Sequence, residues 1–242
     1  MKPGSTGRSG YRGKRAFDLA LTAAGALPAA VVGLVCAAAI KATSAGPILF
    51  RQERVGRDGR TFTLLKFRSM VDRPDNATFP DASQITPVGR WMRQFSLDEL
   101  PQLINVARGE MSIVGPRPTL AYQVARYDAR QRRRLSVNPG LTGLAQVRGR
   151  NEIDWQHRIE HDLEYLERQS LTLDIAIVGQ TVRQLLSRRG VEGHPPEDPI
   201  SRIDGREVQD SRALRAGSAG RVEGTGGDSE ARDGVDGSTS YS

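Results

Sequence analysis

The chain has 242 residues, a single cysteine and a formal net charge of +7 at pH 7. This length allows one ordinary domain with appendages, and a single cysteine excludes an internal disulfide framework and a multi-cysteine metal site. The excess of arginine favours partners that carry phosphate, such as nucleotides, anionic lipids or nucleic acid, and charge alone does not choose among them.

The two ends of the chain differ in composition from its middle. Residues 1–13 are rich in glycine, serine and basic residues and show no apolar periodicity, so they are expected to form a disordered leader. From residue 190 to 242, large apolar residues are scarce and small or charged residues dominate, which predicts a disordered tail. The folded part is therefore expected over 14–189.

The first candidate element is the apolar run Ala16–Ile40, which is long enough to matter to a bilayer. Basic residues stand on both sides, with Lys14-Arg15 before the run and Lys41 after it, so the positive-inside rule places both ends in the cytoplasm. Pro28 lies inside the run and bends a helix there. We expect a re-entrant membrane helix over 14–41; a secretory signal and a simple spanning helix are the alternatives.

The rest of the folded part combines strands and helices. A hairpin is predicted for Ile48–Val55 and Arg60–Arg68, because Gly56-Arg57-Asp58-Gly59 between them contains an Asp-Gly turn signal. Helices are expected over 88–107, 119–135, 154–167 and 173–186, with polar or Gly/Pro-rich loops at 72–85 and 109–118. The fold class is α/β: a small mixed helix-strand domain over 42–189.

Asp98 and Glu99 are the main candidates for catalysis. Ser96 with Glu99 three residues later fits a capping box, which explains the acidic pair without any chemistry. A carboxylate at a helix start beside an anion site could instead be a nucleophile at phosphorus, and Glu99 could hold a divalent metal. These two interpretations are compatible.

Several basic residues are candidates for binding phosphate. Arg117 lies between Pro116 and Pro118, which restrict the backbone and fix the direction of a guanidinium suited to phosphate oxygens. Lys66 and Arg68 alternate on the second predicted strand and should share one face, where a solvated surface is the simpler explanation. Arg90, near the start of the helix predicted over 88–107, belongs to the same candidate set.

Taken together, these segments resemble the bacterial sugar transferases, the monotopic phosphoglycosyl transferases that start exopolysaccharide, O-antigen or glycan assembly. The resemblance covers about 14–188 and depends on several motifs in fixed order. They are Lys14-Arg15-Ala16-Phe17-Asp18, Gly46-Pro47-Ile48-Leu49-Phe50-Arg51-Gln52, Lys66-Phe67-Arg68-Ser69-Met70, Asp98-Glu99-Leu100-Pro101-Gln102, Gly115-Pro116-Arg117-Pro118 and Pro139-Gly140-Leu141-Thr142-Gly143.

The resemblance implies a two-step reaction that needs Mg²⁺. Asp98 would attack the β-phosphate of a UDP-sugar and release UMP, and a polyprenyl phosphate such as undecaprenyl phosphate would then take the phospho-sugar. Glu99 would assist the metal and the nucleophile, and Arg117, Lys66 and Arg68 would bind phosphate. The catalytic domain would sit on the cytoplasmic face of the bacterial inner membrane, in contact with membrane lipids and not with nucleic acid.

The sequence departs from the family pattern at three positions. Leu27 stands before the helix-breaking proline, where serine is common. Leu144 and Arg148 replace a common tryptophan and asparagine, which predicts a change in membrane seating or sugar choice. The chain resembles the minimal form of the family, and its sequence leaves open which sugar it uses and whether it forms a homo-oligomer.

Two other functions compete with the transferase. His157-Arg158-Ile159-Glu160-His161 matches the inverted zinc-protease pattern, although no third ligand is marked and a solvated helix face explains it. A basic membrane or nucleic-acid adaptor would use the arginines of the helix predicted over 119–135; facing lipid headgroups is their simpler role. Those arginines are Arg126, Arg130, Arg132, Arg133 and Arg134.

Overall fold

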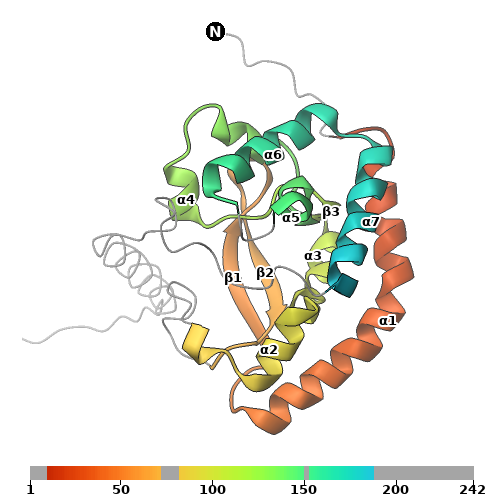
Figure 1. Cartoon of the computed structure of the whole chain (residues 1–242), viewed down its shortest axis with the longest axis vertical. Coiled ribbons are helices and arrows are strands. Elements are labelled where there is room, and N and C mark those ends of the chain that lie inside the picture. The colour runs from red at the N-terminus through yellow and green to blue at the C-terminus, as the bar shows by residue number, and fades with distance from the viewer. Residues whose placement is uncertain (1–9, 72–81, 150–152, 188–242) are drawn as a thin grey trace, which may run out of the picture. The chain divides into compact units, whose positions relative to one another are not determined.

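A computed structural model describes residues 10–71, 82–149 and 153–187 (Figure 1). The tail expected over 190–242, and residues 1–9 of the expected leader, lie outside the described residues. The remaining leader residues, 10–13, are structured: Tyr11 donates a hydrogen bond from its hydroxyl to the carboxylate of Asp174, 3.1 Å away. The leader boundary predicted at residue 13 is therefore too late in the chain.

The apolar run forms the helix α1, Lys14–Thr43. It begins after Gly13, whose positive φ suits glycine, and continues through Pro28 as one element that curves along the domain (Figure 1). The 30 residues give a length of roughly 45 Å, enough to cross a membrane. An apolar helix is confirmed, but it does not break at Pro28; re-entry into the bilayer stays a prediction.

The predicted hairpin is confirmed as the antiparallel strands β1 (Leu49–Val55) and β2 (Thr61–Phe67). The turn between them places Asp58 and Gly59 at positive φ, as the Asp-Gly signal predicts. Phe50 pairs with Lys66 and Arg54 with Phe62, so side chains of even number on both strands share one face.

The helix expected over 88–107 is divided into two. α2 (Pro87–Gln94) ends before a 3₁₀ turn over Leu97–Glu99, and α3 (Gln102–Arg108) follows. The break is at Ser96, which has a left-handed backbone (φ 54°) and makes no side-chain cap, so the expected capping box is wrong. The left-handed backbone at Ser96 separates α2 from the turn that carries Asp98 and Glu99.

The following segment contains two short strands, and the helix expected over 119–135 is wrong. β3 (Ser112–Val114) pairs in parallel with β4 (Gly140–Thr142). Between them lie only a short helix, α4 (Ala121–Ala125), and a 3₁₀ turn over Gln131–Ser136. The helix is interrupted because the Asp128 side chain accepts from the backbone N–H of Gln131 and starts a new turn.

Three helices complete the described part: α5 (Leu144–Gly149), α6 (Trp155–Arg168) and α7 (Leu171–Ser187). The last two confirm the helices predicted over 154–167 and 173–186. The mixed helix-strand class is also confirmed, and the strands of the described residues form two separate two-stranded sheets.

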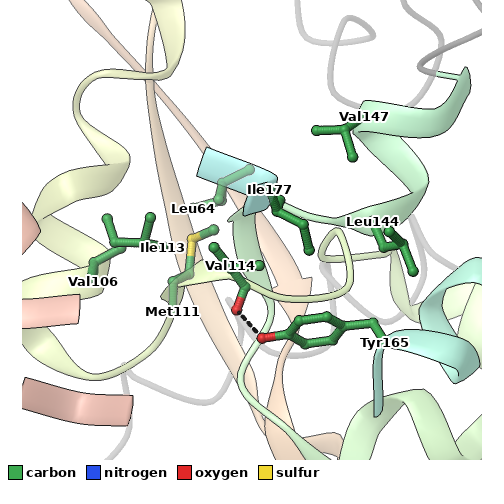
Figure 2. Close-up of a cluster of buried hydrophobic side chains, with 9 residues drawn as sticks. All are labelled: Leu64, Val106, Met111, Ile113, Val114, Leu144, Val147, Tyr165 and Ile177. Carbon is green, nitrogen blue, oxygen red and sulfur yellow. Dashed lines mark hydrogen bonds between the residues drawn. The ribbon is translucent and has the colours of Figure 1, made fainter. Parts of the chain in front are cut away.

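The largest apolar core joins the hairpin to β3 and to the helices around it (Figure 2). Tyr165 of α6 is almost fully buried there, with its hydroxyl 3.1 Å from the carbonyl oxygen of Val114. Leu144, at the position where tryptophan is common in the family, lies in the same core and therefore serves in packing. The core residues are Leu64, Val106, Met111, Ile113, Val114, Leu144, Val147, Tyr165 and Ile177.

α1 packs against this domain near both of its ends. At its start, buried Asp18 bonds to β3, while near its end Cys36 and Ile40 form a cluster with Phe67 and Met92. The middle of the helix leaves large apolar side chains exposed. These exposed side chains are Leu27, Val31, Leu34 and Val35.

Candidate active site

The site is centred on Glu99, which the 3₁₀ turn before α3 places against two cations. Its Oε1 lies 2.8 Å from Nζ of Lys66 on β2 and 2.6 Å from a terminal guanidinium nitrogen of Arg117. Burial by itself would raise the pKa of Glu99, but Arg117 and Lys66 outweigh it and hold that pKa well below its usual range. Glu99 is therefore ionised at neutral pH and fixes both cations.

Asp98 lies beside this ion pair and is buried, with only 8% of its surface exposed. Burial raises the pKa of Asp98, and the charge of Glu99 adds to the increase, whereas Lys66, Arg93 and Arg117 oppose it. Burial removes water from the Asp98 carboxylate. The cations around it would also attract a phosphate, so the carboxylate and a phosphate would be held in the same place. This environment fits a carboxylate nucleophile.

Two polar clamps hold the parts of the site together. Asn105 of α3 accepts from the N–H of Leu65 and donates to the carbonyl of Thr63, which fixes the helix after Glu99 to the strand that carries Lys66. Buried Arg134 donates to the carbonyl of Arg117 at 3.0 Å and pairs with Asp162 of α6. The side chains of both clamps, Asn105 and Arg134, are buried, so they hold the parts of the site in fixed positions.

Glycines allow the loop with Arg117 to pack closely on the segment after Asn138. A Cβ on Gly140 would lie 2.1 Å from the backbone nitrogen of Gly115, and a Cβ on Gly143 would lie 2.2 Å from the Gly115 carbonyl oxygen. No side chain fits at such distances. The two Gly/Pro motifs found in the sequence therefore form one structural unit that supports Arg117.

Sequence reasoning missed two further cations, Arg54 and Arg93. Arg54 of β1 donates to Oε1 of Gln52, at 2.6 and 3.0 Å, and lies 3.4 Å from the carbonyl of Pro118. Burial, followed by the charge of Arg117, lowers the pKa of Arg54 to about 10. The alternation of side chains along the two predicted strands could have indicated Arg54, because Arg54 and Lys66 lie on the same face of the hairpin.

Arg68 and Arg90 do not join the cluster around Glu99. Arg68 follows the end of β2, is buried, and donates to the carbonyl and hydroxyl oxygens of Ser44 after α1. It thus contacts the end of the apolar helix instead of sharing a phosphate face with Lys66. Arg90 is an exposed residue of α2, one turn before Arg93.

The carboxylate pair fits a divalent cation of the Mg²⁺ type. Mg²⁺ is commonly held by one or two carboxylates together with substrate phosphates and water, so a larger protein cage is not required. Both cations contact Oε1 of Glu99, which leaves Oε2 and the Asp98 carboxylate as oxygen ligands. Over the described ranges, no group of three or more acidic, histidine or cysteine side chains forms a metal cage.

The alternative motifs have structural roles. His157 contacts Asp154 at the start of α6, and His161 lies 3.1 Å from the guanidinium of Arg148. Arg148, where asparagine is common in the family, is paired with Glu164.

The predicted lipid-facing arginines are in part neutralised by α6. Arg130 pairs with Glu160, and Arg133 with Glu167. Arg134 is buried, and its guanidinium lies over the rings of both Tyr127 and Trp155. The expected single basic helix is therefore wrong, and contact of the remaining arginines with lipid stays a prediction.

An ionised Glu99 that orders two cations beside a buried Asp98 is an arrangement of charges that suits the binding of phosphate groups. Comparison with known proteins agrees, since the model of the bacterial sugar transferase family matches residues 10–188. The chain belongs to this family, which confirms both the resemblance and its assignment as an enzyme.

Curated relatives include an uncharacterized sugar transferase, EpsL, of Bacillus subtilis, 41% identical over 74% of the chain and 90% of its own length. The exopolysaccharide production protein ExoY of Sinorhizobium fredii is 38% identical over 73% of the chain and 87% of its own length. The UDP-glucose:undecaprenyl-phosphate glucose-1-phosphate transferase of Caulobacter vibrioides is 43% identical over 72% and 70%, respectively.

Proposed function

We propose that the chain transfers a sugar-1-phosphate from a UDP-sugar to undecaprenyl phosphate or a similar polyprenyl phosphate, with release of UMP. This would be the first membrane step in the assembly of a polysaccharide or glycan. The observation that carries the proposal is the buried carboxylate of Asp98 beside the Lys66–Glu99–Arg117 ion-pair group. The choice of substrates is supported by the Caulobacter relative, which is named for transfer of glucose-1-phosphate between UDP-glucose and undecaprenyl phosphate.

In the first step, an oxygen of the Asp98 carboxylate attacks the β-phosphorus of the UDP-sugar. A bond forms between this oxygen and phosphorus, the bond from phosphorus to the bridging oxygen breaks, and UMP leaves with that oxygen. Lys66 and Arg117 bind the transferred phosphoryl oxygens, and Arg54, beyond Arg117, binds the α-phosphate that departs with UMP. Arg93 adds positive potential around Asp98.

A bound Mg²⁺, held by Asp98 and Glu99, would neutralise phosphate charge and reduce the repulsion between nucleophile and substrate. In the second step, an oxygen of the polyprenyl phosphate attacks the same phosphorus. The bond to Asp98 breaks, the carboxylate is regenerated, and the product is a polyprenyl diphosphate sugar. No net proton is gained or lost when phosphates of equal charge exchange places.

The packing of α1 supports a re-entrant or interfacial helix with both ends on the cytoplasmic side. A straight helix of roughly 45 Å that crossed a bilayer core of about 30 Å would separate its ends on opposite faces. Here Asp18 near one end and Ile40 near the other contact the same domain. The exposed apolar side chains around Pro28 would face lipid.

The reaction is tested by UMP release from purified membranes supplied with Mg²⁺, undecaprenyl phosphate and a panel of UDP-sugars. One UDP-sugar should support turnover, and EDTA should stop it. Asp98→Asn should abolish it, whereas Asp58→Asn, the same change on the exposed hairpin turn, should not. Without acceptor, one UMP per enzyme and a sugar-phosphate adduct on Asp98 are expected. Normal turnover by Asp98→Asn would refute the covalent mechanism.

The topology is tested separately with Arg12→Cys and Thr43→Cys in a Cys36→Ser background. A membrane-impermeant maleimide should label both positions in inverted inner-membrane vesicles and neither in intact spheroplasts. Labelling of the two positions from opposite sides would show a spanning helix.

A further inference from the structure

The start of α1 makes polar contacts that membrane attachment does not require. Asp18 is the one acidic residue of α1, and only 3% of its surface is exposed. Burying a carboxylate costs free energy unless several donors satisfy it, and apolar packing would hold a helix at least as well. The position of those donors therefore indicates what the residue does.

Asp18 bonds to the free edge of β3. Its Oδ1 accepts from the backbone N–H of Ile113 at 3.0 Å, and the Ser112 hydroxyl lies 3.0 and 2.9 Å from the two carboxylate oxygens. The other edge of β3 bonds to the β4 segment, from Ser112 N to the Pro139 carbonyl and from Gly115 N to the Thr142 carbonyl. The Asp18 carboxylate therefore accepts a backbone hydrogen bond that a third strand would otherwise accept at this edge.

A second group of contacts fixes Asp18 itself. Nζ of Lys14 lies 3.0 Å from Asp18 and 2.8 Å from fully buried Asp174 of α7. Tyr165, whose hydroxyl is 2.9 Å from Asp174, also reaches the carbonyl of Val114 at 3.1 Å (Figure 2). Side chains from α1, α6 and α7 thus enclose the free edge of a three-residue strand.

β3 leads directly into Gly115-Pro116-Arg117. Because prolines flank Arg117, the chain between Val114 and the guanidinium has few soft torsions, and a shift of the strand is passed on to the side chain. The contact that such a shift would change is the 2.6 Å ion pair between Arg117 and Glu99.

Arg15, the residue after Lys14 in α1, contacts α3, the helix that follows Glu99, which is the partner of Arg117 in this pair. The Arg15 guanidinium donates to the carbonyls of Val106 (2.6 Å) and Ala107 (2.8 Å) in the last turn of α3, where the helix dipole favours a cation. α3 follows the turn that carries Asp98 and Glu99. One segment of the apolar helix therefore contacts both chain segments that meet in the site.

We propose that Asp18 and Arg15 are positioning residues: the start of α1 sets the distance between Arg117 and Glu99 by fixing β3 and α3 relative to each other. The proposal builds on the function proposed above, since it concerns the geometry of the same site. It assigns the apolar helix a role in catalysis besides that of a membrane anchor.

The test combines hydrogen exchange with a double-mutant cycle on the full-length protein in membranes or nanodiscs. Asp18→Asn replaces an acceptor with an amide of the same shape. It should speed amide exchange about tenfold over 112–118 and leave the Leu65 amide unchanged. Arg15→Gln should do the same over 103–109. Thr22→Val, one turn after Asp18, removes a hydroxyl bonded only to the backbone of its own helix, and should change neither segment.

UMP release then shows whether Asp18 acts through Arg117. Asp18→Asn should lower kcat at least about tenfold, because small displacements of a phosphate-binding group are costly, and Thr22→Val should stay within about twofold. In an Arg117→Lys background the same change should cost less than about twofold, since the two residues act in one chain of contacts. Equal losses in both backgrounds, or unchanged exchange over 112–118, would overturn the proposal, as would a uniform increase in exchange along the chain.

If Asp18→Asn does not accumulate as folded protein, Ser112→Ala replaces it under the same criteria, because it removes one donor and leaves the Ile113 contact. Failure of the proposed reaction is separately visible: wild-type protein would then release no UMP from any UDP-sugar, and the exchange measurements would still decide the positioning role.

Discussion

Removal of Lys66 should weaken catalysis and move the acid limb of the pH profile to higher pH. In Lys66→Met the aliphatic part of the side chain is kept, but Glu99 loses a charge-assisted hydrogen bond of 2.8 Å between groups that are only 20% and 16% exposed. Such a bond contributes about 1.5–3 kcal/mol, so a loss of roughly 10- to 100-fold in kcat/KM is expected. Arg117 still holds Glu99, which should preserve the fold.

The sign of the pH effect follows from Asp98. Burial raises the pKa of Asp98, and Lys66 is the largest influence that opposes this increase. As the proposed nucleophile, Asp98 would be active only when ionised, so activity should be present above this pKa and lost as pH falls through it. Without Lys66 the pKa of Asp98 rises further, and the loss must begin at higher pH.

The assay is kcat/KM for UMP release measured across pH in membranes. Arg60→Met is the matched control, because Arg60 is exposed at the turn of the same hairpin and the change removes the same charge. It should leave both the rate and the acid limb in place. An acid limb that stays fixed, or moves to lower pH, in Lys66→Met would contradict the role given to Asp98 as the ionised nucleophile.

Three further changes test other parts of the structure. Arg54→Gln should raise the KM for the UDP-sugar about tenfold in steady-state kinetics, because one charged phosphate contact is lost. Arg51→Gln, on the other face of β1, should leave this KM unchanged. Equal effects of the two changes would argue against a contact between Arg54 and the substrate. Gly140→Ala should lower the free energy of unfolding by roughly 1–3 kcal/mol, since its Cβ would overlap backbone, and an unchanged denaturation midpoint in detergent would contradict that packing. Arg134→Met should cost about 3–5 kcal/mol by leaving Asp162 buried without its partner, and Asp162→Leu added to it should restore part of the loss on thermal denaturation.

The sequence predicted those elements whose signals are local. The apolar run, the Asp-Gly hairpin and the two last helices each have a composition or period that the structure reproduces. The two helices that it predicted too long were interrupted by single residues: Ser96 adopts a left-handed backbone, and Asp128 starts a separate turn. Either residue is tolerated within or beside a helix, so pattern alone does not reveal the break.

The site was predictable where the chemistry is carried by motifs, and less so where it depends on pairing. Lys66, Glu99 and Arg117 were named from the sequence, and the structure brings them together. Arg68 was assigned to phosphate because it alternates with Lys66, but β2 ends at Phe67 and Arg68 turns toward Ser44. Arg54 was missed because its place beside Arg117 depends on the register between two strands and on a loop some 60 residues further along the chain.

The close contact between the two Gly/Pro motifs changes how departures from the family pattern should be interpreted. Leu144 and Arg148 follow the second motif, and their departure from the family pattern predicts a change in membrane seating or sugar choice. Leu144 lies in the same core cluster as Val114, the residue before the loop of Arg117, and Arg148 pairs with Glu164 of α6. A substitution at Leu144 would therefore reach the site through the packing of β3, on which the direction of Arg117 depends. Such a substitution would change the geometry around Arg117 without contact between residue 144 and a sugar or a lipid.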